Sequence, residues 1–138
     1  MPRHHRQPPR LSRFPLSVEL AVEIARIAAE GHPALIVLLL DNSGWLIACR
    51  PHDLAPGDIE ESCRTLLGLL ASESPEQAYL VSVDPGFGTE TAPATAVWPE
   101  LERTFTEAGA TLLDWLLVCD ESVASVAAAA SSVAASRR

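Results

Sequence analysis

The sequence predicts an α/β (α+β) domain in which helices flank a mixed β-sheet, in the order α-β-β-α-β-α-β-β. Residues 34–40 form an uninterrupted apolar run, which is typical of a strand covered on both faces. Apolar stretches of strand length alternate with stretches of helical spacing, and a sheet with helices packed on it buries both. With 138 residues, 48% of them hydrophobic, the chain has room for one ordinary domain with a real core.

The first expected helix follows a basic arm. Residues 1–15 combine prolines with arginines, and we expect them to be disordered. Ser17 is the expected N-cap of the helix and Gly31 its end. Helical spacing places four residues on its apolar face: Leu20, Ile24, Ile27 and Ala28.

A β-hairpin comes next. The apolar run ends at a turn signal over residues 41–44, and residues 45–49 return as the second strand, which Pro51 closes. A second helix is expected after Pro56-Gly57, because Asp58 and Glu61 form a capping-box pattern. Its apolar face comprises Ile59, Cys63, Leu66, Leu67, Leu69 and Leu70.

The second half of the chain completes the sheet. The expected elements are a strand at 79–83, a loop to residue 97, a helix at 98–108, and strands at 111–119 and 122–126. These elements define one domain over residues 16–126, followed by an Ala/Ser-rich, low-complexity tail at 127–138, for which a frayed helix is the alternative. Val133 is the one large apolar residue of that tail.

The distribution of charge makes nucleic acid an improbable partner of the domain. Residues 14–136 hold all 18 acidic residues against four arginines, a balance of −14, whereas the first thirteen residues hold four arginines and no acid. A body this acidic is repelled by phosphate backbones. The longest apolar run is too short to cross a bilayer, and no signal peptide is evident, so we expect a cytoplasmic protein with no membrane partner.

Isolated motifs offer little chemistry. The three cysteines are scattered, which argues against a disulfide framework and favours plain buried thiols. The loop Pro85–Gly88 lacks the spacing of a phosphate-binding loop, so its glycines are expected to serve turn geometry. His32 and His52 are single loop histidines, expected to be structural or solvated.

Three segments together resemble the RadC-like JAB/MPN (JAMM metallopeptidase-like) group. "PALIVLLLDNSGWLIA" (residues 33–48) looks like its opening hairpin. "QAYLVSVDPGFG" (77–88) is similar to the strand that ends in the metal motif His-x-His-Pro, and "LLDWLLVCDESVASV" (112–126) to the closing hairpin. The resemblance implies a JAB/MPN-type domain and the hydrolysis of amide or isopeptide bonds.

The family's reaction needs two histidines and an aspartate on zinc, a glutamate as general base and a serine for the oxyanion. The two histidines correspond to Ser82 and Asp84, and the aspartate to Ala94 or Thr95. The glutamate corresponds to Cys49 or Arg50, and the histidine that follows Leu-Leu-Asp in the family corresponds to Trp115. The resemblance therefore implies a degenerate site in which Ser82, Asp84 and Thr95 occupy the metal-ligand positions without forming a metal site.

Each of these residues also has a structural interpretation, which we favour. Asp84 is expected to be a turn residue before Pro85, with a surviving role as a metal or polar ligand as the alternative. Ser82 is expected to face the core or a sheet edge, and Trp115 to fill the space of a smaller polar side chain. Asp114 lies in an apolar strand and needs a hydrogen-bond partner if it is buried.

The sequence thus favours a non-catalytic, pseudoenzyme-like domain that holds no cofactor and binds or scaffolds a protein or peptide. The alternative is a zinc-dependent hydrolase with rearranged ligands, for example Asp84 with His52 and a side chain from a partner. A third hypothesis is that the resemblance is accidental and that the chain is an unrelated small α/β domain.

Overall fold

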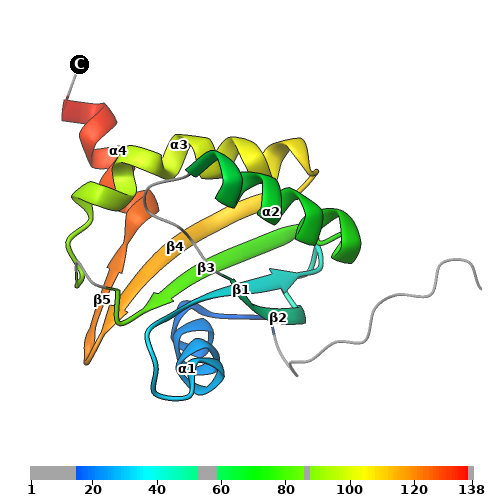
Figure 1. The fold of residues 1–138 in the computed structure, drawn as a ribbon. Helices are drawn as coiled ribbons and strands as arrows, with labels where there is room; N and C mark the ends of the chain where they lie inside the picture. Colours follow the sequence, from blue (N-terminus) through cyan, green and yellow to red (C-terminus); the bar gives the residue numbers. More distant parts are fainter. Residues whose placement is uncertain (1–14, 53–58, 86–87, 137–138) are drawn as a thin grey trace, which may run out of the picture.

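A five-stranded mixed sheet with helices on both faces forms the centre of the molecule, in a computed structural model that describes residues 15–52, 59–85 and 88–136 (Figure 1). The strand order is β2-β1-β3-β4-β5, with β3 and β4 parallel and the other neighbours antiparallel. In chain order the elements are α1 (Val18–Ala29), β1 (Ala34–Leu40), β2 (Leu46–His52), α2 (Ile59–Glu73), β3 (Gln77–Val83), α3 (Ala92–Glu107), β4 (Thr111–Cys119), β5 (Ser122–Ser125) and α4 (Val126–Ser136).

Each face of the sheet has its own apolar cluster. Helices α2, α3 and α4 cover one face, and α1 covers the other (Figure 1). The alternation of side chains along β1 sends Leu35, Val37 and Leu39 to the first cluster and the residues between them to the second. All six residues of β1 from Leu35 onward are buried, which confirms the prediction of a strand covered on both faces.

The helix α1 packs on the sheet through alanines. Ser17 caps it as predicted, since its Oγ accepts a hydrogen bond of 3.1 Å from the backbone N–H of Leu20. Half of the predicted apolar face is wrong: Leu20 and Ile24 are half-buried and pack against the cluster, whereas Ile27 is 71% exposed and Ala28 is also exposed. The buried positions are Ala21, Ala25 and Ala29. Small side chains let the helix backbone approach the sheet closely.

Three elements are longer than predicted, and one of them is β3, which begins at Gln77 and not at residue 79. Strand β2 continues through Pro51 to His52, and its proline is tolerated because β2 is the outermost strand of the sheet. Helix α3 begins at Ala92, where we expected a loop, and it contains Pro93 in its first turn and Pro99 further along. A proline in the first turn removes an N–H that has no partner in the helix.

The chain continues as a helix after β5. We expected a tail in which Val133 was the one large apolar side chain available for docking, but residues 126–136 form α4. Strand β5 ends at Ser125, one residue earlier than predicted. Val126 is fully buried, whereas Val133 is 42% exposed. None of the helices in the described ranges is long and apolar enough to cross a membrane.

Several expectations fall on residues outside the described ranges. They concern the arm up to residue 14, the turn before α2 with Asp58, and the centre of the loop that follows Asp84. The described part of that loop agrees with a role in turn geometry, since Gly88 has a φ of 64° and donates its N–H to the carbonyl of Pro85. On α2, the side chains of Ser62, Leu66 and Leu70 are buried.

Candidate functional site

The candidate site lies where three strands end together. Strands β2 and β3 both run antiparallel to β1, and β4 runs parallel to β3, so the carboxyl ends of β2, β3 and β4 lie at the same end of the sheet. Ser82 and Asp84 are at this end, and α3 starts after the loop that leaves β3. The register also places His52 level with Ser82, through their common neighbour Leu35.

Ser82 and Trp115 hydrogen-bond to each other inside the core. The indole Nε1–H of Trp115 donates to Ser82 Oγ over 2.9 Å, and both side chains are buried, with exposed fractions of 2% for Trp115 and 8% for Ser82. Ser82 therefore faces the core, as predicted, and Trp115 fills a closed space. The bond satisfies the indole N–H in surroundings that are otherwise apolar.

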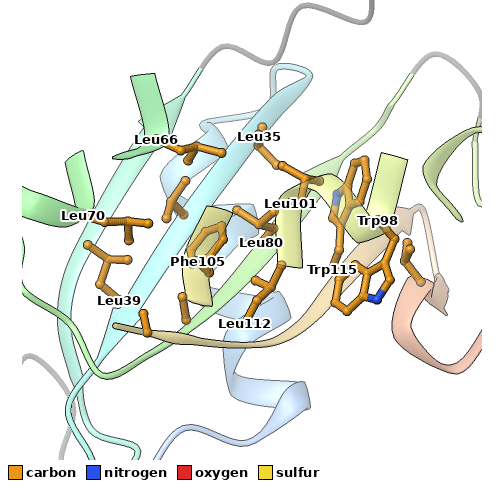
Figure 2. Packing of buried hydrophobic residues seen from close by; sticks show 14 of the residues in the cluster. Leu35, Leu39, Leu66, Leu70, Leu80, Trp98, Leu101, Phe105, Leu112 and Trp115 are labelled. Carbon is orange, nitrogen blue, oxygen red and sulfur yellow. The ribbon is translucent and has the colours of Figure 1, made fainter. Parts of the chain in front are cut away.

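A second indole lies on the same face. Trp98 of α3 and Trp115 of β4 belong to one apolar cluster (Figure 2). Ala94, one turn before Trp98, is 1% exposed and packs into the same cluster. The region beside Ser82 is thus occupied by large apolar side chains.

Asp84 is a turn residue, as predicted. It is exposed and adopts a left-handed backbone with a φ of 51°, which aspartate tolerates better than most residues. Its backbone N–H donates to the carbonyl of Val118 over 2.7 Å and continues the β3–β4 pairing by one residue. Its role at this point of the fold is carried by the backbone.

Thr95 lies in the first turn of α3, not in a loop. Its hydroxyl donates to the carbonyl of Ala92 over 3.0 Å, a bond within the helix. Neighbouring Ala94 is the residue that points into the core. Of the three predicted metal-ligand positions, Ser82 is thus bonded to an indole, Asp84 is exposed, and Thr95 is bonded to its own helix.

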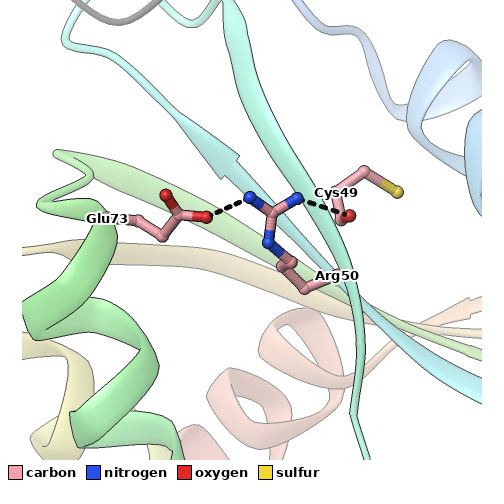
Figure 3. Close-up of polar contacts among 3 residues, drawn as sticks. All are labelled: Cys49, Arg50 and Glu73. Atoms are coloured by element: carbon pink, nitrogen blue, oxygen red, sulfur yellow. Dashed lines mark hydrogen bonds and ion pairs between the residues drawn. The ribbon is translucent and has the colours of Figure 1, made fainter.

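The position expected for a general base holds a cation. Arg50 on β2 forms an ion pair of 2.5 Å with Glu73 of α2, and it also donates to the carbonyl of Cys49 (Figure 3). The register sets Arg50 level with Leu80, two residues before Ser82 on β3. A guanidinium carries N–H donors and no acceptor, so it cannot take a proton from water at this place.

Cys49 lies on the opposite face, beside α1. Its thiol is half-buried, and burial raises its pKa, an effect that the charge of Arg50 partly offsets. All three cysteines are free and half-buried, so they are less buried than the predicted plain buried thiols, and the free thiols agree with the prediction of no disulfide framework.

Asp114 accepts hydrogen bonds at the junction between β5 and α4. The sequence predicted that a buried Asp114 needs a hydrogen-bond partner, but it did not identify the partners. Its Oδ2 accepts from Ser125 Oγ over 2.6 Å, and its Oδ1 accepts from the backbone N–H groups of Trp115 and Ala127 over 2.7 and 3.0 Å. Ser125 in turn accepts from the N–H of Ala128. These bonds cap the start of α4 and give Asp114 a structural role.

A bulge in β4 precedes Asp114. Ala78 pairs with Leu112, and Tyr79 pairs with Asp114, so Leu113 is an extra residue in the strand. Tyr79 is partly buried beside α1, and its pKa is raised by burial first and then by the negative charges of Asp114 and Glu19. The pKa of Tyr79, which lies on the α1 face, is therefore sensitive to the charge of Asp114 at the β5–α4 junction.

The comparisons with known proteins leave the family open. No family model matches the chain, and a search of curated proteins finds no match either. Within the described ranges, no group of three His, Cys, Asp or Glu side chains is close enough together to hold a metal ion.

Proposed function

We propose that this chain is a non-catalytic RadC-like JAB/MPN-type domain that binds or scaffolds a protein or peptide. The observation that carries the proposal is the Ser82–Trp115 hydrogen bond. In the resembled family the position of Ser82 is a histidine of the metal motif and that of Trp115 is the histidine that follows Leu-Leu-Asp, and here the two form a buried contact between a hydroxyl and an indole. Neither group is a zinc ligand of any strength.

The other matched positions support the same proposal. Arg50 is paired with Glu73 where a proton acceptor would be needed, and Thr95 uses its hydroxyl within its own helix. Asp84 alone retains a ligand atom of the right kind, and one exposed carboxylate binds zinc weakly. The apolar residues that define the strands remain, so the fold is kept where the chemistry is replaced.

A polypeptide partner is the chemistry that the surface fits best. The acidic balance of residues 14–136 disfavours nucleic acid. The two outermost strands of the sheet are β2, with seven residues, and β5, with four. An extended peptide would find the longer edge at β2, where main-chain groups of the outer side can pair with an added strand.

Zinc content tests the proposal against the hydrolase alternative. The full chain is purified, exchanged into buffer with excess zinc, freed of unbound metal and analysed by mass spectrometry for zinc per chain. We expect far less than one zinc per chain, and the same value for Asp84→Ala. Stoichiometric zinc that disappears in Asp84→Ala would contradict the proposal and favour the hydrolase with rearranged ligands.

A further inference from the structure

Helix α4 is held on the domain by few large side chains. Val126 at its first position is fully buried, and Ala127 and Ala130 pack against the same cluster. From residue 131 to residue 134 every side chain is exposed. The helix touches α3 and β4 (Figure 1). Alanine buries little apolar surface, so among the α4 side chains that the structure describes, Val126 is the one large apolar side chain that is buried.

The apolar cluster on which α4 packs contains large side chains. The cluster that Val126 joins contains Trp98 of α3 and Trp115 of β4, whose exposed fractions are 7% and 2% (Figure 2). Each indole has a much larger apolar area than Ala127 or Ala130, the alanines through which α4 packs against this cluster. Helix α4 therefore contributes much less apolar surface to this contact than the cluster that it covers.

The start of α4 is held by polar contacts instead. Ser125 accepts from the N–H of Ala128 and donates to Asp114, which also accepts from the N–H of Ala127. These bonds anchor only the first turn, and they act at the point where the chain leaves β5. Loss of them would free the helix while the pairing of β4 with β3 is left in place.

We propose that α4 is a displaceable cover, which opens as a unit separate from the rest of the domain and exposes the indoles of Trp98 and Trp115. The hinge is the β5–α4 junction at Ser125. In the closed state α4 hides an apolar surface, and in the open state that surface faces solvent. The proposal is independent of the metal question and of the family assignment.

Two measurements on the full chain test this, both in a Trp45→Phe background so that fluorescence comes from Trp98 and Trp115. The variant Ser125→Ala with Ala130→Gly weakens α4 at its cap and in its second turn. Hydrogen exchange followed by mass spectrometry should show α4 amides exchanging roughly 10-fold or more faster than before, since cap loss alone shifts the opening equilibrium about 2- to 30-fold. Amides of β3 and β4 should be unchanged, and quenching by acrylamide should rise at least about 2-fold.

A matched control applies the same pair of changes to α1. Ser17→Ala with Ala28→Gly removes the cap of that helix and inserts a glycine at an exposed position. It should speed exchange in α1 and leave both α4 and the quenching unchanged. The proposal is overturned if weakening α4 speeds exchange in β3 and β4 to the same extent, because α4 then opens only with the whole domain. It is also overturned if α4 exchanges faster with no rise in quenching, because the helix then frays without uncovering the indoles.

Discussion

The contact between Trp115 and Ser82 joins two side chains that depend on each other. Trp115 brings an indole N–H into the core, where it needs an acceptor, and Ser82 brings a hydroxyl that is otherwise out of place on a buried strand. A buried donor that loses its acceptor is costly, since the hydrogen bond to water is not recovered. The pair is thus a local source of stability as well as the occupant of the candidate site.

Replacing Ser82 by alanine tests this dependence. Ser82→Ala leaves the Trp115 N–H without its acceptor, and we expect a loss of about 1–3 kcal/mol in the free energy of unfolding. Urea unfolding followed by circular dichroism measures it. Thr95→Ala is the control, because Thr95 matches the same family motif but bonds only within its own helix, and it should change stability by less than about 0.5 kcal/mol. Equal losses in both variants would contradict the prediction.

Tyr79 offers a direct titration, because it is the one tyrosine in the chain. Its absorbance near the phenolate band should give a pKa above the ordinary value, since burial and the charges of Asp114 and Glu19 disfavour the phenolate. Glu19→Gln removes one of these charges, and the pKa should fall part of the way back while remaining raised by burial. Glu23→Gln, on the same helix, should leave it unchanged. A pKa at or below the ordinary value in the unaltered chain would contradict the prediction that burial and negative charge act on Tyr79.

The raised pKa of Tyr79 also fixes the sign of a pH effect. The folded state favours the neutral phenol, so its contribution to stability is present below the ordinary tyrosine pKa and is lost as the pH rises through the folded-state value. The half-buried thiol of Cys49, whose pKa is likewise raised, acts in the same alkaline direction.

At the scale of elements, the packing of α1 is the feature most sensitive to size. Its buried residues recur every fourth position as Ala21, Ala25 and Ala29, and they let the helix lie close to β1 and β3. Ala25→Leu forces the helix away from the sheet or its neighbours off their rotamers, and we expect a loss of about 1–3 kcal/mol in unfolding free energy. Urea unfolding checks it. Ile27→Ala removes a larger side chain but an exposed one, and should stay within about 0.5 kcal/mol. A larger effect of Ile27→Ala than of Ala25→Leu would restore the face that the sequence predicts.

Runs of apolar residues made the strands predictable, whereas faces and helix ends depended on tertiary packing. Residues 34–40 and 111–119 are strands with the predicted bounds, because the first is a continuous apolar run and the second is apolar except at Thr111 and Asp114. The start of α3 was missed because the stretch before Trp98 is rich in Thr, Ala and Pro, a composition typical of a loop. The helix forms there because Ala94, Trp98, Leu101 and Phe105 fall on one buried face.

The same distinction holds for the candidate site. The sequence identified Ser82, Asp84 and Trp115 by position and predicted the core-facing and turn roles that the first two have. It could not show that Ser82 and Trp115 are bonded, since they lie 33 residues apart. The ion pair of Arg50 with Glu73 likewise depends on how α2 lies over β2. The spacing of the alanines in α1 was a signal present in the sequence that large apolar residues outweighed.

At the scale of the whole molecule, charge decides which partners can approach. The 18 acids between residues 14 and 136 outnumber the four arginines there, while the first thirteen residues are purely basic. A polyanion therefore meets repulsion from the domain and attraction from the arm and from Arg137 and Arg138. We expect the full chain to bind double-stranded DNA weakly at low salt and not measurably at physiological salt, in a fluorescence anisotropy titration. Binding that persists at physiological salt would contradict the prediction. Neutralising the arm arginines together with Arg137 and Arg138 should abolish the low-salt signal.

The Ser82–Trp115 contact also constrains how this sequence can change over time. A histidine introduced at position 82 alone would have to fit beside an indole that already fills the space, in a core packed without slack. A smaller residue at position 115 alone would leave a cavity under α3 and α4. Each single step toward a metal site is thus destabilising, and only a joint change at both positions avoids the penalty.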